Sequence, residues 1–263
     1  MEISAKDNAS VKLFNLLKKS KKDRYELGQF TVEGTNLCSE ALKENIEISV
    51  FFAEKSVLEK EKDLFEKIRE KSEKTYIINS KLSSYMSDTK TPQGLFAICK
   101  MTKNQEITEA FSSLGNIIIL ENIQDPGNMG TIIRTADAMG IDLIAVSGDS
   151  ADIYSPKVLR ATTGSVFRQK IVIIENLCKA IEKLNESGFS TYAAALDKDS
   201  KILGEFNFKY PCAVVIGNEG NGLTKEVKEL CTDKIIIPIN EHTESLNAGL
   251  AAGILMWEMS KQR

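Results

Sequence analysis

Apolar residues in the second half of the chain fall into short runs separated by amphipathic stretches. Runs of this kind, rich in Ile and Val, predict buried strands, and the stretches between them have the apolar spacing of helices. Strands that alternate with helices are typical of a parallel sheet with helices on both faces. The predicted strands are Asn116–Glu121, Ile141–Ser147, Lys170–Ile174, Thr191–Ala195, Pro211–Gly217 and Ile235–Ile237.

Helix signals lie between these strands. The pattern predicts a helix from about Thr131 to Met139, ended by Gly140, and another that begins at Ser155 and Pro156. A long apolar helix follows Ser245, which is a plausible N-cap, and continues to the end of the chain.

The first half of the chain has its own alternation of helices and strands. Residues Ala9–Lys22 predict a helix with one apolar and one lysine-rich face, and Phe30–Gly34 predicts a strand that ends in a turn. The alternation stops at the polar segment Met101–Ile107, which we predict to be a linker. We therefore predict a small α/β domain at 1–105 and a parallel α/β domain at 106–263.

Composition narrows the classes of protein. The chain has 263 residues, 42% of them apolar, which is enough for a full core, and it has no apolar run long enough to span a bilayer. Its first residues are too polar for a signal peptide, so we expect a cytoplasmic protein. Five cysteines show no C-x-x-C spacing, and four of them lie in apolar stretches that predict buried, reduced thiols.

The net charge of −3 argues against a strongly basic nucleic-acid binder, but the first part of the chain is mildly basic and the rest is acidic. The basic residues cluster early, and they fit either a phosphate-contacting patch or a solvated helix end. The cluster contains Lys18, Lys19, Lys21, Lys22 and Arg24.

Two loops near the end of the chain are the strongest candidates for a binding site. The turn Gly217–Gly222 has three glycines in six residues, so its main chain can approach a ligand closely. The second loop, Pro238–Glu244, ends the last predicted strand. Because ligands bind open parallel sheets at the carboxyl ends of the strands, we expect both loops to face one crevice.

A third polar segment, Asn122–Gly130, follows the strand at 116–121 and leads to Arg134. Asn122, Asp125 and Asn128 fit a capped turn, and they equally fit a place where ribose or phosphate docks beside a helix N-terminus. An arginine can hold a phosphate through two parallel hydrogen bonds.

These segments together resemble the SpoU (TrmH) family of RNA 2'-O-ribose methyltransferases. The motifs are N-x-x-D-P-x-N-x-G-x-x-x-R-T-A at Asn122–Ala136, G-x-E-x-x-G at Gly217–Gly222, and I-P followed by S-L-N at Ile237–Asn247. The segments Phe30–Gly34 and Thr91–Ile98 are similar to the substrate-binding domain of the ribosomal-RNA branch. Three motifs in the right order make the resemblance specific.

The resemblance implies a SPOUT-type parallel sheet with a C-terminal trefoil knot, a rare exception to the rule that chains are unknotted. It implies S-adenosylmethionine as the methyl donor, bound at Gly217, Ile237 and Leu246. It also implies an RNA substrate, with 23S ribosomal RNA the expected one, and a homodimer formed through the C-terminal domain.

For catalysis the resemblance implies Arg134, with Asn128, Glu219, Ser245 and Asn247 in the pocket. The 2'-oxygen attacks a sulfonium methyl group, so the enzyme must align the two atoms and help the hydroxyl lose its proton. Free arginine has a pKa above about 12, so Arg134 fits two roles, as a base in a special environment or as a clamp on phosphate and ribose.

Four residues depart from the family pattern, namely Ile239, Glu241, Ala248 and Gly249. Glu241 replaces a flexible glycine and adds a charge near the expected cofactor. The sole histidine, His242, has no second ligand beside it for a metal, so we predict no metal site.

Three alternatives remain open from the sequence. One is a non-catalytic RNA-binding or ribosome-assembly factor with this fold, and another is a tRNA 2'-O-methyltransferase. A nucleotide-dependent oxidoreductase is disfavoured because the first predicted strand of the second domain lacks the G-x-G-x-x-G turn.

Overall fold

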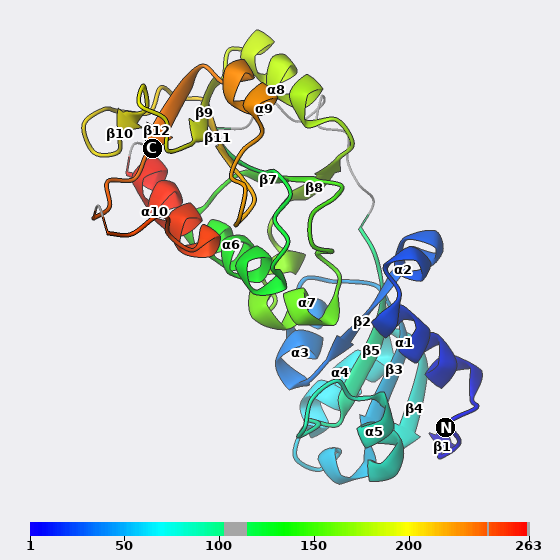
Figure 1. Cartoon of the computed structure of the whole chain (residues 1–263). Helices are drawn as coiled ribbons and strands as arrows, with labels where there is room; N and C mark the ends of the chain where they lie inside the picture. Colours follow the sequence, from blue (N-terminus) through cyan, green and yellow to red (C-terminus); the bar gives the residue numbers. More distant parts are fainter. Residues whose placement is uncertain (103–114, 241, 262–263) are drawn as a thin grey trace. The chain divides into compact units, whose positions relative to one another are not determined.

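The protein is described by a computed structural model that covers residues 1–102, 115–240 and 242–261 (Figure 1). Two compact units pack separately. Unit 1 comprises Met1–Lys103 with Asp152–Phe167, and unit 2 comprises Asn104–Ala151 with Arg168–Arg263. The predicted linker and the boundary at residue 105 fall largely outside the described residues, so the division into domains stays a prediction.

Unit 1 is built on a mixed five-stranded sheet in the order β1-β4-β3-β5-β2, in which β5 pairs antiparallel with β2 and β3. Its strands are β1 (Glu2–Ile3), β2 (Gln29–Glu33), β3 (Ile48–Glu54), β4 (Ser72–Ile78) and β5 (Leu95–Lys100). Its helices are α1 (Ala9–Lys19), α2 (Lys21–Leu27), α3 (Thr35–Lys43), η1 (Lys55–Val57), α4 (Lys62–Lys71), α5 (Ser80–Met86), α7 (Pro156–Thr162) and η4 (Ser165–Phe167).

Unit 2 is built on a parallel seven-stranded sheet in the order β10-β12-β9-β11-β6-β7-β8. Its strands are β6 (Asn116–Leu120), β7 (Leu143–Ser147), β8 (Ile171–Ile174), β9 (Ser190–Ala194), β10 (Lys201–Ile202), β11 (Cys212–Ile216) and β12 (Asp233–Ile236). Its helices are α6 (Pro126–Met139), α8 (Leu177–Glu186), α9 (Lys225–Leu230) and α10 (Ala248–Ser260). The predicted α/β class with a parallel sheet is therefore confirmed, as is the small α/β module before it.

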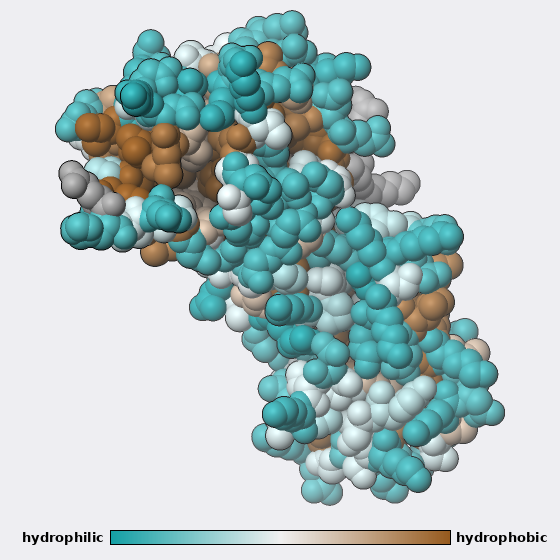
Figure 2. Space-filling model, viewed as in Figure 1, coloured by the Kyte–Doolittle hydropathy of each residue, from teal (hydrophilic) through white to brown (hydrophobic). Residues whose placement is uncertain are grey.

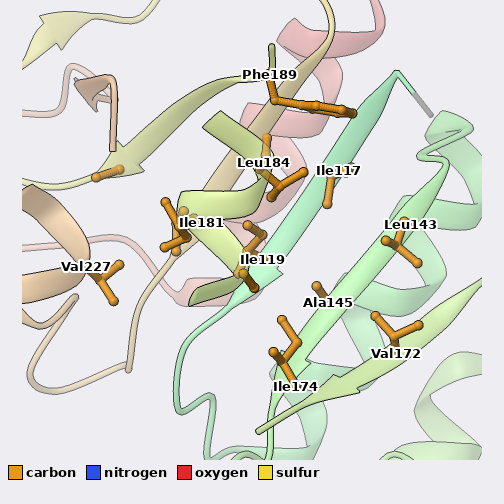
Figure 3. Close-up of a cluster of buried hydrophobic side chains, with 14 of the residues drawn as sticks. Ile117, Ile119, Leu143, Ala145, Val172, Ile174, Ile181, Leu184, Phe189 and Val227 are labelled. Atoms are coloured by element: carbon orange, nitrogen blue, oxygen red, sulfur yellow. The ribbon is translucent and has the colours of Figure 1, made fainter. Parts of the chain in front are cut away.

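Helices cover both faces of the parallel sheet. On one face, α8 and α9 pack on alternate residues of the central strands, and Figure 3 shows Ile181, Leu184 and Val227 directed toward Ile119 and its neighbours. On the other side, α10 packs along α6 (Figure 1). Because every strand of this sheet runs in the same direction, the loops after β6, β9, β11 and β12 all emerge at the carboxyl ends of the strands, on the same side of the sheet.

Helix α6 begins earlier than the sequence pattern predicts. The segment Pro126–Gly130, which the pattern assigns to a polar turn, forms the first turns of the helix. The Asp125 side chain accepts a hydrogen bond from the Asn128 amide at 2.8 Å. Pro126 is the first residue of the helix, where a backbone N–H would have no partner within the helix, so its absence loses no hydrogen bond. The predicted stop at Gly140 is confirmed, since Gly140 has a left-handed φ of 64°.

Two of the five basic residues in the early cluster have structural roles in unit 1. Lys18 donates to the Met86 carbonyl at 2.6 Å, and burial lowers the pKa of its ammonium group. The side chains of Arg24 and Asp152 are 4% and 5% exposed, and they form an ion pair with Nε 2.8 Å from Oδ2. Only Lys19, Lys21 and Lys22 of the cluster are exposed.

The pair of Arg24 and Asp152 anchors the segment Asp152–Phe167 within unit 1. We expect Arg24→Ala to lower the free energy of unfolding by about 3–5 kcal/mol, because it leaves the Asp152 carboxylate buried without its positively charged partner. Urea unfolding followed by far-UV circular dichroism measures the change.

Lys22→Ala is the matched control, because Lys22 is 81% exposed and its distance to Glu26 is 3.6 Å. Its effect should stay within about 0.5 kcal/mol. Equal stabilities for Arg24→Ala and wild type would show that the buried pair anchors nothing.

Candidate active site

A cavity of about 450 Å³ opens in unit 2 at the carboxyl ends of β9, β11 and β12. Its walls are the turn after β11, the loop after β12 and the first turns of α10, so the two predicted loops do face one crevice. Cavities of about 300–1,000 Å³ hold small-molecule ligands and cofactors. The predicted residues that line it are Gly217, Glu219, Ile237, Ser245 and Leu246.

The wall formed by the turn after β11 is main chain packed against main chain. A Cβ atom on Gly217 would lie 2.3 Å from the Gly222 carbonyl carbon and 2.4 Å from the Leu223 nitrogen, so only glycine fits there. Gly222 has a φ of 66°, a conformation that side-chain-bearing residues resist. The glycines of this motif therefore shape the wall.

The carboxylate of Glu219 joins this turn to the loop after β6. One oxygen accepts from the Asp125 amide and from Asn128 Nδ2, both at 3.0 Å, and the other accepts from the Gln124 amide at 3.1 Å. Burial acts to raise the pKa of Glu219, but the hydrogen bonds from Asn128, Asp125 and Gln124 outweigh it and hold that pKa below its ordinary value.

A series of hydrogen bonds between side chains continues from Glu219 to the start of α10. Asn128 is 8% exposed, and its Oδ1 accepts from Asn247 Nδ2 at 2.8 Å. Asn247 in turn accepts from the Leu250 amide and caps α10. Three segments that are far apart in the sequence are thus joined by the side chains of Glu219, Asn128 and Asn247.

Ser245 has a different position from the one that the sequence predicts. The N-cap of α10 is Asn247, so Ser245 lies in the preceding loop, where it lines the cavity. An asparagine caps as well as a serine does, and Asn247 stands directly before the helical residues. Glu241, one of the four departures from the family pattern, lies outside the described residues.

Three predicted site residues, Arg134, Asn128 and Asn247, do not line the cavity. Asn128 and Asn247 are joined to its wall through Glu219, whereas Arg134 is not. It lies in the third turn of α6, because that helix begins at Pro126, and its side chain is exposed. Its guanidinium group forms no hydrogen bond or ion pair with any residue that the structure describes. The predicted roles of Arg134 and of the pocket residues stay predictions.

The cavity also has residues that sequence reasoning missed. Ala194, Leu196 and Asp197 line it from the end of β9, and Lys228, which lies 3.2 Å from Asp197, contributes from α9. The polar stretch after the predicted strand at 191–195 is the only sequence feature that could have indicated these residues. It does not assign them to the cavity, because the sequence does not reveal that β9 lies between β11 and β12.

The other departures from the family pattern lie at or beside the cavity. Ile239 and Ala248 line it. A Cβ atom on Gly249 would lie 3.3 Å from Thr131 Cβ on α6, so the glycine permits the close packing of α10 on α6. No group of three or more His, Cys, Asp or Glu residues among those described could hold a metal ion.

Comparison with known proteins places this site in a family. The model of the SpoU rRNA Methylase family matches residues 115–257, and that of the MRM3-like substrate binding domain matches residues 8–97. The 23S rRNA (guanosine(2553)-2'-O)-methyltransferase RlmP of Bacillus subtilis is 30% identical over 258 residues, 98% of each chain. An uncharacterized tRNA/rRNA methyltransferase of Synechocystis is 32% identical over 99% of this chain and 94% of its own.

Among solved structures, the AdoMet-bound rRNA methyltransferase from Sinorhizobium meliloti has a TM-score of 0.88 and 28% identity, covering 99% of this chain and 97% of that one. Fold and site thus define an RNA methyltransferase with a substrate-binding domain before the catalytic one. The chain belongs to the SpoU rRNA methylase family, which confirms the resemblance seen in its motifs.

The lowered pKa of Glu219 leads to a prediction about pH. A carboxylate with a depressed pKa stabilises the folded state fully above its ordinary value of 4.5 and loses that contribution as pH falls through the folded value. Wild type should therefore be more stable than Glu219→Gln at pH 7, and the difference should shrink as the pH is lowered below 4.5. Denaturant unfolding of both proteins across this range measures it.

Glu229→Gln removes a carboxylate that is 64% exposed and should change the free energy of unfolding by less than about 0.5 kcal/mol throughout. A difference between wild type and Glu219→Gln that grows toward low pH would contradict the sign of the shift.

Proposed function

We propose that this protein transfers a methyl group from S-adenosylmethionine to a ribose 2'-oxygen of 23S ribosomal RNA. The observation that carries the proposal is the cavity at the carboxyl edge of the parallel sheet, with the chain of Glu219, Asn128 and Asn247 beside it. The B. subtilis relative, named as a 23S rRNA 2'-O-methyltransferase, aligns along nearly the whole chain and supports the ribosomal substrate. Such a substrate implies a cytoplasmic protein.

The cavity suits S-adenosylmethionine in size and in chemistry. It combines the main chain of Gly217–Gly222 with the apolar side chains of Ile237 and Leu246 and the hydroxyl of Ser245, so it offers both polar and apolar surface to a nucleoside. When bound, the cofactor supplies a methyl group on a positively charged sulfur.

The role of Glu219 in this reaction is to hold the site together. Its two carboxylate oxygens accept three hydrogen bonds, and its pKa is lowered, which makes it a poor proton acceptor. The proton of the 2'-hydroxyl must therefore pass to another group. Arg134 assists that step or clamps the phosphate, and its exposed position leaves it accessible to RNA.

Unit 1 has the surface for holding the RNA. The match to a substrate-binding domain covers residues 8–97, and Lys19, Lys21 and Lys22 are exposed there at the ends of α1 and α2. Lysines contact the phosphates of RNA without reading its sequence. Unit 1 then contributes to binding and orienting the RNA.

We also propose a homodimer formed through α10. Leu250 is 55% exposed and Trp257 is 53% exposed, and they lie two turns apart on the same side of the helix. Figure 2 shows hydrophobic surface gathered on unit 2 in the region of α10 and β12. Large apolar side chains that stay in water on one helix face are typical of a surface that another chain covers.

Methyl transfer to RNA provides the first test. We expect the wild-type protein to label 23S rRNA from a strain that lacks the gene, with S-adenosylmethionine carrying a radioactive methyl group. Arg134→Ala should bind the cofactor with unchanged affinity in calorimetry but lose at least about 100-fold in transfer rate, because a group that acts only on the hydroxyl contributes at this scale.

Arg69→Ala, which removes an exposed arginine of unit 1, serves as the control and should keep full activity. Labelling of tRNA instead of rRNA would overturn the ribosomal substrate. A wild-type protein that binds no cofactor would overturn the whole proposal.

The dimer is tested separately by light scattering after size-exclusion chromatography. We expect Leu250→Glu to give a monomer, because a charge in the centre of an apolar interface is costly to bury. Leu27→Glu makes the same change at a leucine that is 50% exposed on unit 1, and it should leave the dimer intact. A wild-type monomer would contradict the proposal.

A further inference from the structure

Both the oxygen and the nitrogen of the Asn218 side-chain amide form hydrogen bonds. Its Oδ1 accepts from the amides of Gly220 and Asn221, each at 3.0 Å, and its Nδ2 donates to the Asn122 carbonyl at 2.8 Å. The first two bonds lie inside the turn after β11. The third reaches another loop, the one that follows β6.

The backbone of Asn218 closes the same turn. Its amide donates to the Gly222 carbonyl at 3.1 Å, and the Gly222 amide donates back to the Asn218 carbonyl at 2.9 Å. This reciprocal pair brings the two ends of the turn together and sets Gly222 against Gly217. Asn218 therefore determines the shape of the turn through both its main chain and its side chain.

Only asparagine supplies this set of bonds at this length. Serine and aspartate offer an acceptor to the following amides, as asparagine does in such turns, but neither can also donate to a carbonyl at the distance of Asn122. An aspartate would direct a charged oxygen at that carbonyl oxygen. Glutamine has the right groups but a longer side chain.

The partner of Asn218 is itself fixed. Asn122 has a φ of 53°, its amide donates to Ser147 Oγ at 2.8 Å, and its side chain accepts from Gln124. The carbonyl that Asn218 reaches is thus held in place by bonds to β7 and to its own loop. The bond can act as a fixed anchor for the turn.

The anchor lies next to Glu219, whose carboxylate contacts the same segment two to six residues further along, at Gln124, Asp125 and Asn128. Glu219 is exposed, so neighbouring packing alone does not confine its side chain. With Asn218 tied to Asn122, the Cα of Glu219 has a set distance from Gln124, Asp125 and Asn128. The three hydrogen bonds to the carboxylate then form without a search among rotamers.

We propose that Asn218 is a positioning residue of the methyl-transfer reaction, which fixes the turn after β11 to the loop after β6 and thereby holds Glu219 on Asn128. The residue lines the cavity, but three of the four hydrogen-bonding positions of its side-chain amide are used within the protein, and we infer that it acts through Glu219 and Asn128. This inference rests on the proposed function.

The test uses Asn218→Asp in the full-length protein. The substitution keeps the acceptor for Gly220 and Asn221 and removes the donor to Asn122. We expect the fold and the affinity for S-adenosylmethionine to be retained, within about threefold, and the turnover number on 23S rRNA to fall by about tenfold or more, since a lost hydrogen bond of this kind changes rates on that scale.

Asn176→Asp is the matched control. Asn176 is exposed and caps α8, with Oδ1 accepting from the Lys179 amide at 3.0 Å, and an aspartate caps equally well. It makes the same chemical change in the same unit and should leave turnover and cofactor affinity as in wild type.

A second variant separates positioning from charge. Asn218→Ser is neutral, keeps a hydroxyl for the turn and cannot reach Asn122. We expect the pKa of Glu219, measured by carboxyl NMR titration, to rise toward its ordinary value in this variant, because the carboxylate leaves its donors. This reading needs no enzymatic activity, so it stays informative if wild type transfers no methyl group to 23S rRNA.

Two results would overturn the proposal. One is an unchanged turnover number in Asn218→Asp, including the case in which only cofactor affinity falls, which would make Asn218 a binding residue. The other is a Glu219 pKa in Asn218→Ser equal to that of wild type, which would show that Glu219 is held without Asn218.

Discussion

The site depends on hydrogen bonds that join three segments of the chain through the carboxylate of Glu219 and the side chain of Asn128. Glu219 comes from the turn after β11, its donors come from the loop after β6 and from α6, and Asn128 carries the contact on to Asn247 before α10. Hydrogen bonds to an ionised acceptor are about twice as strong as neutral ones. A single charge can therefore hold together loops that the sheet alone only brings to the same edge.

Close packing of α10 on α6 is the second constraint, and it depends on small residues. A Cβ atom on Gly249 would approach Thr131 to 3.3 Å, and one on Gly253 would approach Thr135 Cγ2 to 3.7 Å. Because α6 carries Asn128 and α10 begins at Asn247, the spacing of the two helices sets the length of the bond between these side chains. The departure from the family pattern at Gly249 thus bears on the geometry of the site through packing.

The sequence predicts the order of strands and helices well, because apolar periodicity reflects which side of each element is buried. It fails where a local signal has two meanings. The residues Asp-Pro-Gly-Asn at 125–128 are typical of a turn. An aspartate N-cap followed by proline at the first helical position is equally typical of a helix start, and the structure has the helix. Arg24 reads as one of five surface cations, and its burial depends on Asp152, which is 128 residues away.

Contacts between distant segments are equally hidden in the pattern. The order β12-β9-β11 decides that the end of β9 joins the cavity, and no periodicity encodes which strands are neighbours. The role of Asn218 is hidden for a similar reason, since asparagine in a glycine-rich turn is expected for the turn alone. Its bond to Asn122 becomes visible only when both loops are placed.

The exposure of Arg134 bears on the two roles that the sequence leaves open. An arginine surrounded by water keeps its proton, so a role as base needs surroundings that remove water and favour the neutral form. No described residue of its own chain bonds to the guanidinium group, and the side chain is exposed. Such surroundings would have to come from the RNA or from a second copy of the chain, whereas a clamp on phosphate needs only the exposed, charged side chain that is present. The exposed position thus suits a clamp, and the choice between clamp and base stays a prediction.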